Sequence, residues 1–298
     1  MMNYLVTGGT GLVGKKLVDA LKKDNKVYVL TRSDCTNEAN IYYINWTNEE
    51  FEKLIPNIDV VINLAGASLQ HRWTASHKRS IMESRIKTTN LLFDLFKDKS
   101  APKVLFNASA VGYYPPSKSI VYSEQDTFYP HDFLSEVVFK WEATAKKFES
   151  IGTRVVLGRF GVVFSNEGGA LPMMVKPYQY YIGGKLGDGK QLMSWIHIDD
   201  LIQAILYIIH HDIDGAVNLT SPEVLSQDEL GKHIGNVLNK PHYLPAPSSA
   251  LKLILGEQSD MVLKTQGVLP QRLMDAYFNF EYPTIQLALE DLVKYEGE

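Results

Sequence analysis

The sequence has one cysteine, no excess of basic charge and no long apolar run. A lone Cys35 excludes an internal disulfide framework, and we expect a reducing compartment. The formal net charge of −4 argues against a dedicated nucleic-acid binder. Polar residues interrupt each apolar run before the roughly 18 residues that a membrane span needs. Because the first strand is expected to start at about Asn3, we expect no signal peptide and a cytoplasmic protein.

Glycines follow the first apolar run and lead into a helical pattern. Residues 4–7 are typical of a buried strand, and apolar residues recur from Leu17 to Leu21. Between them, Gly8, Gly11 and Gly14 fit the spacing GxxGxxG, and Gly9 in place of Gly8 gives GxGxxG. Such a turn directs backbone N–H groups and a helix N-terminus at a phosphate. The stretch therefore predicts a dinucleotide site rather than a turn without a ligand.

A cation follows the second expected strand, where an NAD-specific site would have an acidic residue. Thr31 stands at the acidic position and Arg32 comes next. A guanidinium beside the adenosine ribose suits a 2′-phosphate, so the sequence favours NADP(H) over NAD. A solvated arginine at a strand end is the alternative, and nearby Asp34 keeps NAD open.

Strand-like and helix-like patterns alternate through the first 160 residues. This alternation predicts an α/β protein with a doubly wound, parallel Rossmann sheet. Gly, Pro and Tyr are frequent over 161–194, which we interpret as loops over a site, and a strand and helix are expected over 195–220. The predicted domains are a cofactor-binding Rossmann domain over 1–160, to which about 195–220 returns, and a smaller α/β substrate domain over 161–298. Short helices are expected over 48–55, 226–238, 248–255 and 284–293.

Small and polar residues stand at the carboxyl ends of two further expected strands, where open α/β sheets bind ligands. One strand ends at Leu64, Ala65 and Gly66; the other continues from Ala108 into Ser109, Tyr113 and Tyr114. Arg159 and His197 are expected beside the same cleft. No second His or Cys stands at ligand spacing from His197, so no metal site is predicted, and Asp200 is interpreted as a helix-start residue. The candidate cofactor-binding residues are Gly8, Gly9, Thr10, Gly11, Leu12, Val13, Arg32, Leu64, Ala65, Gly66, Ala108 and Arg159.

The motifs together resemble the extended short-chain dehydrogenase/reductase superfamily, which includes nucleotide-sugar epimerases. More closely, the chain is similar to atypical "epimerase family" proteins that end in a small C-terminal domain. The stretches that carry this resemblance are Asn63-Leu-Ala-Gly-Ala-Ser, Arg72-Trp-Thr, Ser84-Arg85, Ala108-Ser-Ala-Val-Gly-Tyr-Tyr, Phe133-Leu, Trp141-Glu142, Gly168-Gly-Ala-Leu and Trp195-Ile-His-Ile-Asp-Asp. The resemblance implies a Rossmann fold, a nicotinamide cofactor and a small-molecule substrate. Superfamily relatives often pair through their long helices, so a homodimer is left open.

The resemblance also exposes a departure at the catalytic positions. The superfamily uses a Tyr and, four residues later, a Lys that lowers the Tyr pKa. Here Leu134 and Val138 align with those positions, and Arg85 stands where a helical Asn is expected. Only Ser109 matches the superfamily's polar set. Arg85 and Arg72 are candidates for an anion-facing role, with a solvated helix face as the alternative.

Two functions follow from this departure. In the first, the protein is an NADP(H)-dependent epimerase-like or reductase-like enzyme. Ser109 then hydrogen-bonds the substrate, and Tyr113 or Tyr114 transfers the proton. In the second, it binds NADP(H) without catalysis, as a redox sensor or partner-binding module. The shaped polar and aromatic lining expected from residues 168–195 favours the enzyme.

Overall fold

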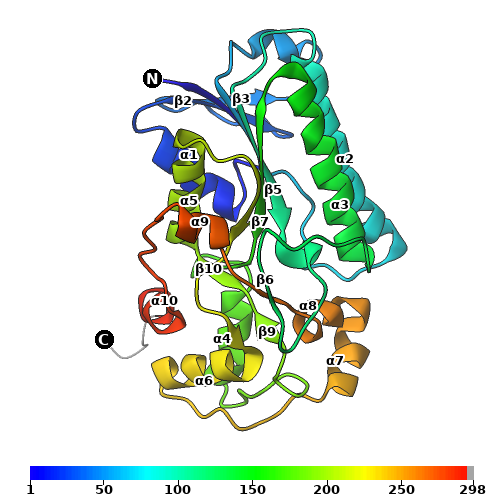
Figure 1. Cartoon of the computed structure of the whole chain (residues 1–298), viewed down its shortest axis with the longest axis vertical. Helices are drawn as coiled ribbons and strands as arrows, with labels where there is room; N and C mark the ends of the chain where they lie inside the picture. The colour runs from blue at the N-terminus through cyan, green and yellow to red at the C-terminus, as the bar shows by residue number, and fades with distance from the viewer. Residues whose placement is uncertain (294–298) are drawn as a thin grey trace.

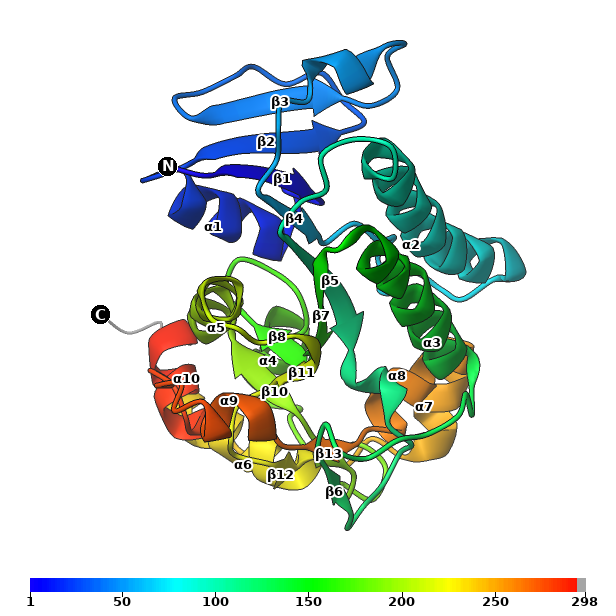
Figure 2. The same ribbon diagram turned by 45° about the horizontal axis from the view of Figure 1, so that its top comes forward.

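The predicted parallel sheet is present in the computed structural model, which describes residues 1–293. All seven strands run parallel, in the order β11-β7-β5-β4-β1-β2-β3. Figures 1 and 2 show this sheet in the upper part of the molecule. Its strands are β1 (Asn3–Thr7), β2 (Lys26–Thr31), β3 (Ile41–Asn45), β4 (Val60–Asn63), β5 (Val104–Ala110), β7 (Arg154–Phe160) and β11 (Gly215–Leu219).

Helices cover both faces of this sheet. The helices are α1 (Leu12–Leu21) and α5 (Ile198–His210) on one face, and α2 (Ala75–Phe96) and α3 (Phe133–Ala145) on the other. Because successive side chains of a strand point to opposite faces, Tyr4 and Val6 join the α1/α5 core while Leu5 joins the α2/α3 core. Burial on both sides explains why the strands are apolar throughout. The α/β doubly wound fold is thereby confirmed.

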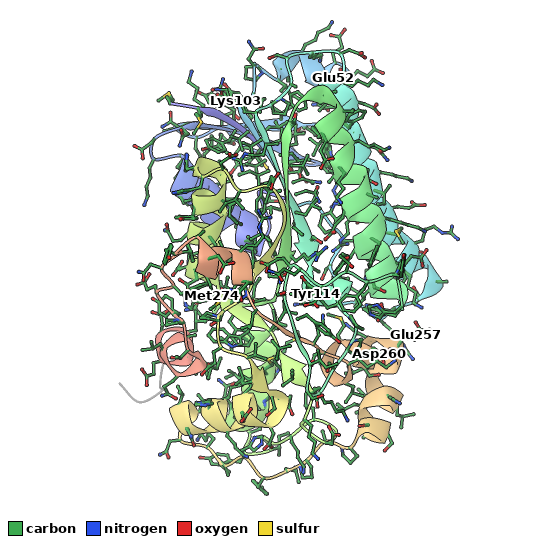
Figure 3. All side chains as sticks on the ribbon, in the orientation of Figure 1. Glu52, Lys103, Tyr114, Glu257, Asp260 and Met274 are labelled. Atoms are coloured by element: carbon green, nitrogen blue, oxygen red, sulfur yellow. The ribbon has the colours of Figure 1, made fainter. Side chains whose placement is uncertain are left out.

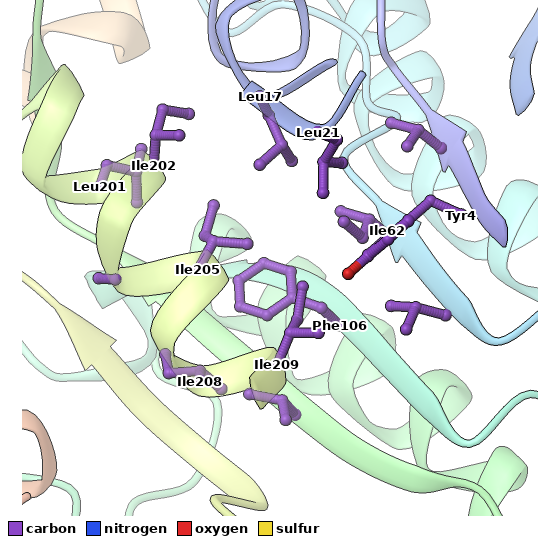
Figure 4. Packing of buried hydrophobic residues seen from close by; sticks show 14 of the residues in the cluster. Tyr4, Leu17, Leu21, Ile62, Phe106, Leu201, Ile202, Ile205, Ile208 and Ile209 are labelled. Carbon is purple, nitrogen blue, oxygen red and sulfur yellow. The ribbon is translucent and has the colours of Figure 1, made fainter. Parts of the chain in front are cut away.

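Apolar packing holds α5 against the sheet. Figure 4 shows Ile205 and its neighbours on α5 facing Leu17 and Leu21 of α1 and Phe106 of β5. Ile205 and Ile208 are fully buried. Burial of each such side chain contributes about 1.5–3 kcal/mol, far more than helix propensity does. This packing returns the chain to the sheet before β11.

Buried polar groups connect the carboxyl ends of β1 and β4 to the middle of the neighbouring strand β5. The Thr7 hydroxyl of β1 donates to Asn63 Oδ1 of β4 at 2.6 Å, and Asn63 Nδ2 donates to Asn107 Oδ1 of β5 at 2.6 Å. All three side chains are fully buried. Because buried amides lose considerable free energy when a partner is absent, these bonds keep the strands in register.

A second, smaller core is built by elements such as α4 (Leu171–Gln179) and α6 (Gln227–Leu238), which lie below the sheet in Figure 1. Phe164 and Trp195 stack within it at a centroid distance of 5.7 Å. Among the described residues, the lower part of the molecule contains three two-stranded sheets. They pair β8 (Val162–Phe164) with β10 (Trp195–His197), β9 (Leu192–Met193) with β12 (Leu225–Ser226), and β6 (Val121–Tyr122) with β13 (Gly267–Val268). The helices of this second core are α4, α6 and α10 (Ile285–Leu292). The C-terminal part also contains α7 (Ser248–Leu255), α8 (Asp260–Leu263) and α9 (Gln271–Asp275), and Leu273 of α9 packs into the α1/α5 core of the sheet.

Two local predictions were wrong. Residues 161–194, interpreted as loops, contain β8 and the helix α4. Pro172 lies in the first turn of α4, where its missing N–H breaks no helical hydrogen bond, and Leu171, Val175 and Tyr178 bury one face. The helix expected over 48–55 is only a 3-10 turn, Phe51–Leu54, because it buries no side chain completely.

The remaining short helices agree with the sequence. α6 ends at Leu238 as predicted and begins at Gln227, one residue after the predicted start, because Ser226 is its N-cap and forms a reciprocal capping box with Glu229. α7 and α10 also lie where expected. Within residues 1–293, none of the helices has both the length and the apolar character that a membrane crossing demands.

Candidate functional site

The glycine turn joins β1 to α1 with very little space around its backbone. Gly8 has a φ of +70°, a left-handed conformation that favours glycine, and a Cβ there would lie 2.7 Å from the carbonyl carbon of Leu64. A Cβ on Gly14 would overlap the Gly8 carbonyl oxygen. Gly11 precedes α1 and no side chain caps it, so the first N–H groups of the helix stay available to an anion.

A cavity of about 410 Å³ opens beside this turn. It extends from the glycine turn along the ends of β4 and β5 to the start of α3 and the segment after α8. Volumes in this range are typical of small-molecule sites. Its lining includes Gly8, Gly11, Leu12, Val13, Leu64, Arg85, Ala108, Ser109, Tyr114, His131, Asp132, Leu134, Val138, Trp141, Met261, Lys264, Thr265 and Gln266.

The structure brings about half of the predicted cofactor residues to the cavity wall. The predicted residues on the wall are Gly8, Gly11, Leu12, Val13, Leu64 and Ala108, whereas Gly9, Thr10, Arg32, Ala65, Gly66 and Arg159 are not part of it. Arg32 is exposed, directly after the end of β2. Gly66 lies against the Arg85 guanidinium, since a Cβ on Gly66 would be 2.8 Å from Arg85 Cζ.

Ser109 belongs to a buried network at the end of β5. Its hydroxyl donates to Glu142 Oε1 of α3 at 2.6 Å, and Arg159 of β7 donates to both oxygens of Glu142 at 2.9 Å. Burial opposes the charge on Arg159, but the hydrogen bonds and charge of Glu142 outweigh burial and raise the pKa of Arg159. All three residues are at most 6% exposed. Arg159 therefore holds Glu142, and Glu142 orients the Ser109 hydroxyl.

Both candidate tyrosines, Tyr113 and Tyr114, are buried beside Arg159. The Tyr114 hydroxyl accepts from Arg159 Nη1 at 3.0 Å and donates to Asn218 Oδ1 at 2.8 Å. Burial raises the pKa of Tyr114 to about 12, although Arg159 opposes the shift. Arg159 Cζ lies 3.3 Å from the ring centroid of Tyr113, whose side chain is not on the cavity wall. Figure 3 shows Tyr114 in the middle of the molecule, between the sheet and the lower helices.

Several residues on the cavity wall have no place among the candidates chosen from the sequence. Leu134 and Val138 present apolar side chains from α3, and Lys140, the lysine of that helix, is bonded to Glu136 at its surface. His131 and Asp132 stand at the start of α3, with 3.8 Å between His131 Nε2 and Asp132 Oδ2. A histidine directly before a helix start is a weak sequence signal. Glu142 could have been suspected from the Trp141-Glu142 motif.

The C-terminal segment closes the far end of the cavity. Met261, Lys264 and Gln266 line it, and Gln266 Nε2 donates to the Val111 carbonyl just after β5. Gln258 Nε2 donates to the Leu69 carbonyl at 2.9 Å and so ties the segment to the loop before α2. Residues more than 150 positions after Ser109 thus complete its surroundings.

His197 and Asp200 make contacts within the protein and are not part of the cavity wall. His197 is fully buried, stacks on Tyr282 at 3.8 Å and has 3.1 Å between Nε2 and Asp291 Oδ2. Asp200 lies in the first turn of α5, as predicted, and accepts from the backbone N–H groups of Glu281 and Tyr282. Burial raises the pKa of Asp200, which these bonds oppose. Among residues 1–293, no cluster of side chains is suited to a metal ion.

Two family models match this chain. The family model described as "NAD dependent epimerase/dehydratase family" matches residues 4–220. The chain belongs to this family. A model described as a domain of unknown function (DUF1731) matches residues 246–292 of the epimerase-family protein, the part that contains the cavity's C-terminal wall.

Similar proteins match almost the full length of the chain. An epimerase family protein of Staphylococcus aureus strain N315 is 52% identical over 99% of this chain and 100% of its own length. One from Staphylococcus saprophyticus is also 52% identical, over 98% of this chain and 100% of the relative. A crystal structure of human epimerase family protein SDR39U1 (isoform 2) with NADPH has a TM-score of 0.88 and 29% identity, covering 98% of this chain and 99% of that one.

Proposed function

We propose that this epimerase-family protein binds NADP(H) and is an oxidoreductase or epimerase-like enzyme for a small molecule. The main support is the cavity that connects the glycine turn, Ser109 and the C-terminal segment. A nucleotide on the turn and a substrate at the far end would then meet beside Ser109. The human relative that was crystallised with NADPH supports the choice of cofactor.

The residues of the turn fit a nicotinamide dinucleotide. Gly8 and Gly14 leave the backbone bare where a Cβ would collide, and the uncapped start of α1 offers N–H groups to a pyrophosphate. Leu12, Val13 and Leu64 provide apolar wall beside it. When bound, NADPH would supply a hydride to a substrate carbonyl.

Ser109 would orient the substrate. Its hydroxyl donates to Glu142, so its lone pairs remain to accept from a substrate hydroxyl in the cavity. Because the Arg159–Glu142 pair is buried and bidentate, this orientation is held firmly. Ser109 is therefore a positioning group whose direction is determined by its partners.

His131 would carry the proton in place of the superfamily's Tyr–Lys pair. Leu134 and Val138 occupy the aligned positions and cannot transfer protons. The Tyr114 hydroxyl is engaged on both sides and has a raised pKa. His131 lines the cavity beside Asp132, and imidazoles are the usual acid–base groups near neutral pH.

Substitution of Ser109 by Ala tests the enzyme. We expect the purified wild type to oxidise NADPH with at least one member of a panel of carbonyl compounds that also carry a hydroxyl, which can donate to Ser109. S109A should lower kcat about 100-fold, because the substrate loses its orientation, and change NADPH affinity less than about 3-fold. The decrease in NADPH absorbance at 340 nm measures kcat, and fluorescence titration measures NADPH affinity. The exposed Ser119→Ala variant is the control.

The alternative is NADP(H) binding without catalysis, and the apolar pair Leu134 and Val138 favours it. If NADPH binds but no compound in the panel is reduced, the protein is better described as a redox sensor or a partner-binding module.

Substitution of Arg32 by Ala tests the preference for the phosphorylated cofactor. The guanidinium would bond a 2′-phosphate, so R32A should weaken NADPH binding by about 10- to 100-fold. NADH affinity should stay the same. Calorimetric titration with both cofactors measures this, and an equal loss for both would remove Arg32 from the role.

A further inference from the structure

Arg85 is a cation of the cavity wall that lacks a carboxylate partner. It lies on α2, and its Nη1 donates to the carbonyl oxygens of Ile81 at 3.0 Å and Ala67 at 3.3 Å. Within residues 1–293, no Asp or Glu oxygen lies within 4.0 Å of the Arg85 guanidinium, and no hydrogen bond involves its Nε or Nη2. Three of its five N–H groups are therefore available to a ligand.

The fold holds this guanidinium in one place. Arg85 Cζ lies 5.1 Å from the ring centroid of Trp141 on α3, a cation–π distance, and Gly66 leaves the space that the guanidinium fills on its other side. Burial lowers the pKa of Arg85 to about 10. A group that retains its charge under this penalty is stabilised strongly by an added anion.

The other charged groups on the same wall already have partners. Lys264 is paired with Asp260 at 2.9 Å, and Asp132 accepts from the Ser135 N–H at the start of α3 and faces His131. Among the charged side chains of the cavity wall in residues 1–293, Arg85 thus differs in having no oppositely charged neighbour. The charge that would balance it has to come from a ligand.

We propose that Arg85 is the anion receptor of the substrate site and that the small-molecule substrate carries a carboxylate. That the bound anion is a substrate rests on the proposed function, whereas the anion site at Arg85 does not depend on it. The planar fork of an arginine matches two carboxylate oxygens. The cofactor's pyrophosphate is the other source of an oxyanion, and the uncapped start of α1 already serves that group.

Oxalate is the probe, titrated calorimetrically into the full chain with and without saturating NADP⁺. We expect the wild type to bind oxalate in the presence of NADP⁺ and Arg85→Gln to bind it at least about 10-fold more weakly. Arg85→Lys should bind with intermediate affinity. Lys140→Gln, which removes an exposed cation of α3, should match the wild type. Thermal melting confirms that each variant is folded.

Separate results would overturn the proposal. If the NADP⁺-bound wild type binds no oxalate, or if R85Q binds it as well as the wild type, Arg85 is not a carboxylate receptor. If R85Q loses NADPH affinity while oxalate affinity is unchanged, Arg85 serves the cofactor. If the wild type binds no NADPH yet oxalate binding depends on Arg85, the anion site stands and the proposed function fails.

Discussion

Gly14→Ala should reduce NADPH affinity by about 100-fold or more. The added Cβ would overlap the Gly8 carbonyl oxygen and come within 2.7 Å of the Gly9 Cα, so the turn has to move. These contacts are with backbone, which cannot turn aside as a flexible side chain can. Overpacking of this kind costs about 1–3 kcal/mol, and 2.7 kcal/mol corresponds to roughly 100-fold in affinity. Fluorescence titration with NADPH measures the loss.

Lys15→Ala is the matched control for this substitution. Lys15 is the next residue of α1 and is exposed, so its truncation should leave NADPH affinity within about 2-fold of the wild type. Circular dichroism separates a local change in the turn from unfolding of the sheet. A folded G14A protein with wild-type affinity would contradict the assignment of the glycine turn as the cofactor site.

Glu142→Leu should lower the free energy of unfolding by roughly 3–5 kcal/mol. The substitution leaves the Arg159 guanidinium buried without its carboxylate, and removal of one partner of a buried ion pair costs about that much. It also removes the acceptor of the Ser109 hydroxyl. Urea denaturation followed by tryptophan fluorescence measures the change.

Two further variants decide whether the buried charge is the cause. The double variant Glu142→Leu with Arg159→Met should recover a large part of the loss, because no unpaired charge remains. Glu136→Gln removes the exposed ion pair of the same helix, with Lys140, and should cost less than about 1 kcal/mol. A cost below about 1 kcal/mol for E142L would show that solvent or another group balances Arg159.

The glycine turn and the sheet could be predicted because their signals are local. A buried parallel strand needs an uninterrupted apolar run, and the turn needs glycine where a Cβ would collide, as at Gly14. The helix α4 was missed because its prolines resemble loop residues in sequence. Only the burial of Leu171, Val175 and Tyr178 against the lower core shows why a helix forms there.

Site residues were harder to predict than the fold. Ser109 and Arg159 are recognisable from their strands, but the carboxylate that links them comes from α3, and its identity depends on which helix face turns toward β5. Likewise, the sequence leaves open whether Arg85 faces solvent or a ligand. The position of Trp141 and Gly66 around its guanidinium resolves that choice in favour of the cavity.

Local sequence pattern was thus sufficient for the α/β class, the strand alternation and the glycine turn between β1 and α1, since each depends on residues within about one turn or strand of one another. Which side chains surround Ser109 was decided by long-range packing: α3 supplies Glu142, and the segment around Lys264 and Gln266 arrives from the far end of the chain. No short-range spacing encodes such neighbours, because burial and hydrogen bonding between distant segments bring them together.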